Sequence, residues 1–127
     1  MNYDEILRAA YATFATGDLD GYLSYCTPDI RFTIPGRNAL SKTYDRETFK
    51  AGLIADVMTM TAGTFKETVL DVFTSPRGGV VHAHHEFARD GERREYHTMH
   101  LYEFRDGKLA SFREVPEDLY AFDAAWS

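Results

Sequence analysis

The stretch VVHAHHEF at residues 80–87 decides the fold, because its side chains alternate with a period of two. The odd-numbered positions form the more apolar face of this stretch: Val81, Ala83, His85 and Phe87. A sheet that is covered on one side buries its apolar face. We therefore expect a strand with His85 on the inner face and with His82 and His84 on the outer face.

Two more alternating segments follow, at residues 95–105 and 108–115, and an Asp-Gly pair precedes each of them. Asp-Gly between alternating runs is typical of a tight hairpin turn. The pattern predicts that residues 80–89 pair antiparallel with residues 95–105, and that these pair with residues 108–115.

The first half of the chain is mainly helical in its periodicity. Apolar residues at spacings of three and four predict helices at residues 3–16, after Asp18 and at residues 45–60, with Asn2, Asp18 and Asp45 as N-caps. Strands are expected at residues 29–34 and 65–74, a loop at residues 37–44, and a short tail after Pro116.

These elements predict an α+β fold in a single domain of 127 residues. A curved, mostly antiparallel sheet would wrap around three N-terminal helices and leave a cone that is open at one end. Polar groups that point into such a cone are candidates for chemistry.

Composition restricts the classes of function. The net charge is −6 and no arginine or lysine stripe is present, which argues against nucleic acid as a partner. No stretch has the length and apolar character of a membrane span, and the first residues lack the pattern of a signal peptide. Cys26 is the single cysteine, so no disulfide can form within the chain. We expect a cytoplasmic protein without a membrane partner.

Several strings in the chain resemble a known family. They are GDLDGYL at 17–23, TPDIRF at 27–32, PG at 35–36, RDG at 89–91, FRDGKL at 104–109 and DAAW at 123–126. Their order and spacing resemble the SnoaL-like, ketosteroid-isomerase-like branch of the NTF2-like superfamily. The resemblance implies a cone-shaped fold, usually a homodimer. Members include isomerases, cyclases, dehydratases and epoxide hydrolases, so the fold does not settle the function.

Aligned on the first of these strings, the ketosteroid-isomerase base falls on Ile34, its oxyanion tyrosine on Ala10 beside Tyr11, and its oxyanion aspartate on His100. All three residues differ from those of the isomerase, so the match predicts that this is not a true ketosteroid isomerase. The epoxide-hydrolase arrangement of an arginine between two aspartates has no counterpart either.

The family match places the even-numbered face of residues 95–105 inward, and Ala110, Phe112 and Glu114 with it. The candidate catalytic residues that would then share the cavity are His85, His100, Tyr102 and Glu114. His100 and Glu114 are the acid–base candidates, with Tyr102 or His85 as hydrogen-bond donor. A two-residue turn predicts Glu114 opposite Met99, and a three-residue loop with a bulge predicts it opposite Thr98. A purely structural role for the two histidines stays open.

The remainder of the cavity is expected to bind a small apolar or aromatic molecule. The expected lining consists of Tyr11, Phe32, Ile34, Tyr44, Phe87, Thr98, Phe104 and Phe112. Arg37, Lys42 and Tyr44 lie in the loop expected near the mouth, where they either bind an anionic group or are solvated.

A metal site is a further alternative, at His82, His84 and Glu86, which alternate along the outer face. We expect no metal and no cofactor there, because this face is better suited to a dimer interface or to solvent. Met99, Leu101 and Val115 on the outer face predict the interface of a homodimer. The function expected is a cofactor-free isomerase, cyclase or dehydratase; the alternatives are a non-catalytic ligand-binding module and a scaffold dimer.

Overall fold

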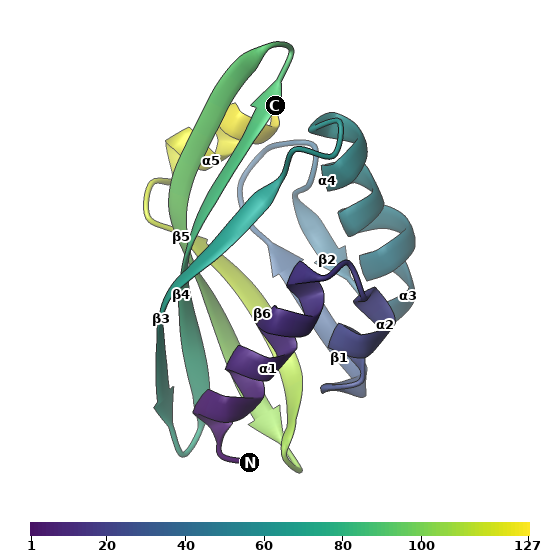
Figure 1. Cartoon of the computed structure of the whole chain (residues 1–127), viewed down its shortest axis with the longest axis vertical. Helices are drawn as coiled ribbons and strands as arrows, with labels where there is room; N and C mark the ends of the chain where they lie inside the picture. The colour runs from purple at the N-terminus through teal and green to yellow at the C-terminus, as the bar shows by residue number, and fades with distance from the viewer.

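The computed structural model describes residues 1–127 and consists of one curved sheet with helices packed along it (Figure 1). In chain order the elements are α1 (Tyr3–Ala15), α2 (Leu19–Leu23), β1 (Cys26–Ile34), β2 (Lys42–Tyr44), α3 (Arg46–Thr48), the π-helical segment η1 (Phe49–Ile54), α4 (Ala55–Met60), β3 (Lys66–Ser75), β4 (Gly78–Arg89), β5 (Glu92–Arg105), β6 (Lys108–Pro116) and α5 (Leu119–Trp126). Helix α1 crosses in front of the sheet, and α3 and α4 stand at the side of the molecule where β1 and β2 lie (Figure 1).

The six strands form one sheet in the order β2-β1-β6-β5-β4-β3. The β1–β6 pairing is parallel and the other four pairings are antiparallel. The predicted pairing of β4 with β5, and of β5 with β6, is confirmed, and so is the α+β fold with a curved, mostly antiparallel sheet.

Both Asp-Gly turns are two-residue hairpin loops. Asp90 and Gly91 have φ angles of 51° and 79°, and Asp106 and Gly107 have φ angles of 52° and 76°. Positive φ at both central positions is the requirement of a type I′ turn, which matches the twist of the flanking strands. The turn residues therefore explain why these hairpins form where the sequence predicts them.

The burial along β4 and β5 confirms the predicted faces. His85 and His100 are each 4% exposed, whereas His82 and His84 lie on the outer face and remain partly exposed. The inner face thus carries two buried histidines that come from adjacent strands.

A bulge in β6 sets the position of Glu114. The register shifts between the pairs Glu103–Ser111 and Phe104–Leu109, so Ala110 is an extra residue in β6. As a result Glu114 lies opposite His100, and both predicted registers, opposite Met99 and opposite Thr98, are wrong. The same bulge turns Leu109 into the core, while Ala110, which was predicted to face inward, is only partly buried.

The predicted N-caps are present. The side chain of Asn2 accepts from the backbone N–H of Glu5, at 2.8 Å, and that of Asp18 accepts from the backbone N–H of Gly21, also at 2.8 Å. Asp45 forms a capping box with Thr48. These contacts satisfy N–H groups that the first helical turn leaves unpaired.

Two segments differ from the prediction. The expected loop at residues 37–44 ends in the edge strand β2, whose backbone pairs with Phe32–Ile34 and so satisfies the edge of β1. The expected tail forms α5, which Asp118 caps and whose residues Phe122 and Trp126, one turn apart, are both 1% exposed. Burial of these two aromatic side chains accounts for a helix at the chain end.

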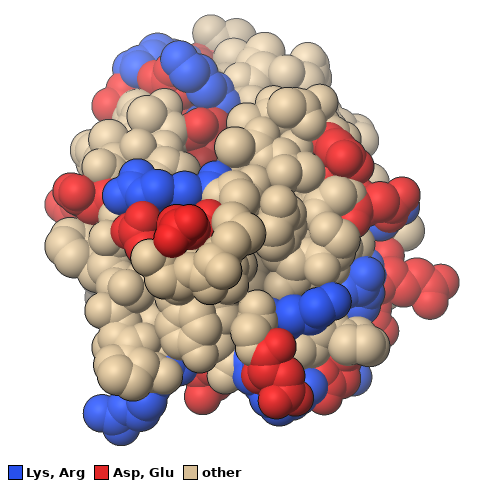
Figure 2. Space-filling view, turned by 60° about the horizontal axis from the view of Figure 1, so that its bottom comes forward, with Lys and Arg blue, Asp and Glu red and all other residues tan.

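Several charged residues on the surface form pairs of opposite sign. On the face in Figure 2, Lys and Arg side chains lie beside Asp and Glu side chains, with uncharged surface between them. Lys50 and Asp20, for example, are 2.6 Å apart. No helix is long and apolar enough to cross a membrane.

Candidate functional site

A cavity of about 900 Å³ opens between the helices and the inner face of the sheet. This volume lies within the usual range for sites that hold small organic molecules. Of its 28 lining residues, 20 are hydrophobic. The hydrogen-bonding side chains of interest in this lining are Tyr11, Tyr22, Glu67, His85, Tyr96, His100, Tyr102 and Glu114. The cavity is therefore apolar over most of its wall and has one group of interacting polar side chains.

His100 and Glu114 form a buried pair within this group. Nε2 of His100 lies 2.9 Å from Oε2 of Glu114, which also accepts a short hydrogen bond from the hydroxyl of Thr98. Burial alone would lower the pKa of His100, but the charge of Glu114 and their hydrogen bond outweigh it and raise the pKa. Burial likewise opposes ionisation of Glu114, yet the attraction of His100 lowers the pKa of this carboxyl below its ordinary value. The pair therefore favours imidazolium and carboxylate.

Three tyrosine hydroxyls extend this pair across the cavity wall. The hydroxyl of Tyr11 lies 2.6 Å from Nδ1 of His100 and 2.6 Å from the hydroxyl of Tyr102, which lies 2.8 Å from that of Tyr22. Burial raises the pKa of all three tyrosines well above the ordinary value, so the hydroxyls remain neutral.

The donor–acceptor direction of this row of hydrogen bonds depends on the charge of His100. When the ring is neutral and Nε2–H donates to Glu114, Nδ1 accepts from Tyr11, Tyr11 accepts from Tyr102, and Tyr102 accepts from Tyr22. When the ring is protonated, Nδ1–H donates to Tyr11 and every hydroxyl in the chain reverses. Protonation of His100 thus changes the hydrogen-bond direction at Tyr22, which is three hydrogen bonds away.

A second histidine–carboxylate pair lies beside the first. Nε2 of His85 is 2.6 Å from Oε2 of Glu67, and its Nδ1 is 3.0 Å from the hydroxyl of Tyr96. The indole N–H of Trp126 donates to this hydroxyl at 2.9 Å. Because Tyr96 accepts from Trp126, its own proton is free to go to Nδ1, which leaves Nε2–H of His85 to donate to Glu67.

Both carboxylates keep one oxygen available. The hydrogen bonds of Glu67 and Glu114 all go to Oε2. The two Oε1 atoms accept no hydrogen bond from the protein, and they are not fully buried. Both glutamates line the cavity, and their side chains are 12% and 7% exposed. Each histidine, by contrast, has both ring nitrogens engaged.

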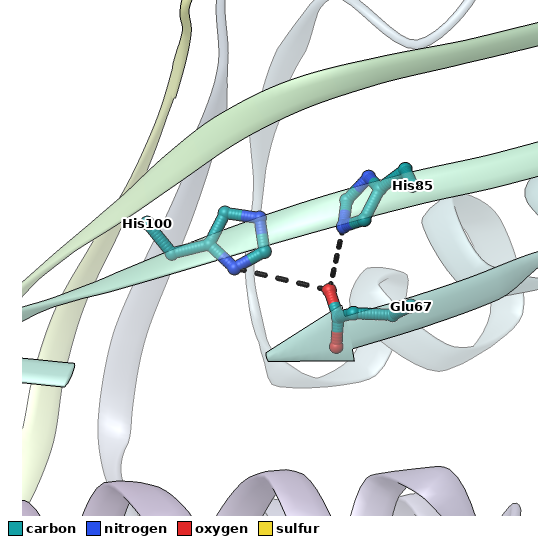
Figure 3. A group of neighbouring side chains, drawn as sticks. All are labelled: Glu67, His85 and His100. Atoms are coloured by element: carbon teal, nitrogen blue, oxygen red, sulfur yellow. Dashed lines mark hydrogen bonds and ion pairs between the residues drawn. The ribbon is translucent and has the colours of Figure 1, made fainter. Parts of the chain in front are cut away.

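The residues whose donor atoms converge closely enough to hold a metal ion are Glu67, His85 and His100, within 4.8 Å of one another. Figure 3 shows both rings directing a nitrogen at the carboxylate of Glu67; Nδ1 of His100 is 3.9 Å from Oε2. Two histidines and one carboxylate are a donor set that suits transition metals. Here the same atoms are occupied by hydrogen bonds to Glu67 and Tyr11. The predicted alternative on the outer face, His82, His84 and Glu86, does not converge in this way.

Comparison with known protein families shows to which family the chain belongs. A profile described as a SnoaL-like domain matches residues 7–112. The chain belongs to the SnoaL-like family. The predicted membership is thus confirmed.

Three known proteins are similar to this SnoaL-like chain over nearly its whole length. An uncharacterized protein of Mycobacterium tuberculosis is 23% identical over 97% of this chain and 95% of its own. Bal32a, from a soil-derived mobile gene cassette, is 28% identical with a TM-score of 0.89, and covers 97% of this chain and 95% of its own. TerC, which was co-crystallised with polyporic acid, is 25% identical with a TM-score of 0.80, and covers 93% of this chain and 92% of its own.

Most of the residues predicted for the site of this SnoaL-like protein lie at the cavity. All four catalytic candidates, His85, His100, Tyr102 and Glu114, line it and belong to the polar group described above. Of the predicted substrate contacts, Tyr11, Ile34 and Phe112 line it as well. The position that matches the isomerase tyrosine is the buried Ala10, but the hydroxyl of its neighbour Tyr11 reaches His100.

The other predicted contacts are absent from the lining. Phe32, Tyr44, Phe87 and Thr98 are buried in the protein, and Phe104 stacks on Tyr3 with ring centroids 3.8 Å apart. A side chain that faces inward therefore does not always line the cavity, because packed side chains fill the narrower part of the cone. In the segment expected near the mouth, Lys42 lies over the ring of Tyr44, and neither this lysine nor Arg37 lines the cavity.

The sequence prediction missed Glu67, Tyr22, Tyr96 and Trp126 as site residues. Glu67 had a recognisable signal, since it stands between Phe65 and Val69 on the inward face of β3 and pairs directly with His85. A single acid within an apolar face indicates a buried partner, because an unpaired buried charge is costly. Trp126 had no such signal, because its contact depends on how α5 folds back onto the sheet.

Proposed function

We propose that this protein is a cofactor-free acid–base enzyme that acts on a small, largely apolar molecule in the cavity. The reaction is an isomerisation, cyclisation or dehydration, in which one substrate atom loses a proton and another gains one. The observation that carries the proposal is the 2.9 Å contact of His100 with Glu114 at the wall of a mainly apolar cavity.

The chemistry follows from the way the pair is connected. Glu114 lines the cavity with its Oε1 free of protein hydrogen bonds, and His100 stabilises the charge of this carboxylate through Oε2. At the other side of His100 the chain of hydroxyls ends at Tyr22, which also lines the cavity. A proton can therefore be accepted at one point of the wall and donated at another. Positioned acid–base groups contribute about 10²- to 10⁴-fold to a rate.

A similar protein of known structure supports an organic ligand. TerC, a similar protein of known structure, was co-crystallised with polyporic acid. The apolar wall of this cavity, with few polar groups placed together, is the kind of site that binds such molecules.

The test measures proton transfer without knowledge of the natural substrate. A panel of ring-containing ketones is first screened for binding by calorimetry. The ligands that bind are then incubated with the protein in D₂O, and NMR follows deuterium uptake next to the carbonyl. We expect wild type to accelerate the exchange of at least one bound ketone and Glu114→Gln to lose most of this acceleration, with His97→Gln on the outer face as the control.

The second candidate is a binding module without catalysis. It is favoured by one observation, namely that both ring nitrogens of His85 and of His100 are already engaged. A fully satisfied network rigidifies a pocket and need not move protons. Ketones that bind but exchange no faster with wild type than with Glu114→Gln would favour this second candidate.

A further inference from the structure

The polar part of the cavity carries two carboxylates, Glu67 and Glu114, against one imidazolium, His100, whose ring nitrogens are held by Glu114 and Tyr11. Glu67 and Glu114 each present one oxygen that no protein group binds. The arginine and the lysine of the lining pair with acids that do not line the cavity: Arg8 contacts Asp4 at 2.9 Å and Lys66 lies 3.8 Å from Glu86. A ligand that enters therefore meets acceptors and neutral hydroxyls.

Glu67 is the more accessible of the two carboxylates. It lies on β3, the edge strand of the sheet, and its side chain is 12% exposed against 7% for Glu114. His85 fixes its Oε2 at 2.6 Å, and His85 is itself fixed through Tyr96. The direction of Oε1 is thus set before any ligand arrives.

Such an oxygen discriminates between ligands by charge. A ligand hydroxyl or N–H group can donate to it and satisfy the partly buried acceptor. A ligand carboxylate placed there would be repelled in a medium of low polarity, because the one imidazolium, His100, is already paired with Glu114 and compensates only one of the two carboxylates. An apolar ligand without a donor would leave the oxygen unsatisfied.

We propose that the ligand of this cavity is an uncharged, ring-containing molecule whose hydroxyl or N–H group donates to Oε1 of Glu67, and that Glu67 determines the specificity against anionic ligands. The proposal shares its cavity with the proposed function and adds the class of ligand. It requires no turnover.

Three fluorescent probes with the same ring system test this directly: hydroxypyrene, pyrene and pyrenecarboxylate. Their dissociation constants are measured by fluorescence titration near neutral pH, where the phenol is neutral and the acid ionised. We expect hydroxypyrene to bind at least about tenfold more tightly than pyrenecarboxylate, and more tightly than pyrene.

The variant Glu67→Gln identifies the cause. A glutamine can still accept from His85 through its oxygen, and it then turns an NH₂ donor to the cavity. The preference for hydroxypyrene over pyrenecarboxylate should fall roughly tenfold or reverse, whereas Glu103→Gln, exposed on the outer face of β5, should leave it unchanged. Thermal melting of both variants verifies that they are folded.

The outcomes separate this inference from the proposed enzyme. Equal or tighter binding of pyrenecarboxylate by wild type, an unchanged preference in Glu67→Gln, or no binding of any probe would overturn it. If wild type prefers hydroxypyrene and Glu67→Gln loses this preference, but no bound ketone exchanges deuterium, the proposed ligand class is supported and the proposed enzyme activity is not.

Discussion

His100 and Glu114 face each other across the β5–β6 ladder, with Nε2 of the ring 2.9 Å from Oε2 of the carboxylate. Only the bulge at Ala110 brings them into this register. Loss of either partner leaves a buried group without its counter-charge, which typically costs on the order of 3 kcal/mol of stability.

The variant His100→Ala removes the centre of the polar network. We expect the rate of the chemical step to fall about 10²-fold or more, because Glu114 loses its stabilising partner and the hydroxyl chain loses its end. Single-turnover kinetics on a substrate found by the exchange screen measures it. His97→Ala, on the outer face of the same strand, is the matched control. Equal rates in the two variants would exclude His100 from the chemistry.

The same pair predicts a stability that depends on pH. The pKa of Glu114 is lowered from 4.5, so its contribution is present above that value and is lost as the pH falls through the lowered pKa. The pKa of His100 is raised from 6.5, so its contribution is present below that value and is lost as the pH rises through the raised pKa.

The two contributions overlap between the ordinary values of 4.5 and 6.5. Urea unfolding of wild type and of the double variant H100Q/E114Q at about pH 4, 5.5 and 8 should therefore show the largest difference in unfolding free energy at the middle pH. A difference that is smallest there would mean that the pair is not charged in the folded protein.

Metal ions should have little effect on the inner site. The donor atoms of Glu67, His85 and His100 are held in hydrogen bonds, so a cation would have to break the contacts of His100 with Tyr11 and of His85 with Glu67. We expect that neither EDTA nor zinc changes the melting temperature through these residues. Stabilisation by zinc that is lost in His85→Gln but kept in His84→Gln would contradict the cofactor-free account.

The outer face of the sheet predicts self-association. Met99, Leu101 and Val115 are 40%, 44% and 37% exposed on adjacent strands, an apolar patch that suits a two-fold interface. We propose a homodimer through this face. Light scattering at micromolar concentration should give about twice the chain mass of 14.5 kDa, and Leu101→Glu should give the monomer. A monomeric wild type would contradict it.

Local periodicity was sufficient to predict five of the six strands, the faces of β4 and β5, and the two Asp-Gly turns, because each depends on neighbours in sequence. The contact of Glu114 with His100 was not predictable in register, since a single bulged residue decides it. The contact of Trp126 with Tyr96 depends on the packing of α5 at the other end of the chain. Long-range packing also explains why Phe32 and Phe87, though correctly expected to be buried, do not line the cavity.

The central claim is that His100 is held by Glu114 as one member of a charged, proton-transferring pair. The most direct measurement is a ¹⁵N NMR titration of the imidazole side chains. The account predicts that His100 stays protonated above the ordinary histidine pKa of 6.5, and that this pKa falls in Glu114→Gln. A His100 that titrates below 6.5, or whose pKa is the same in Glu114→Gln, would contradict it.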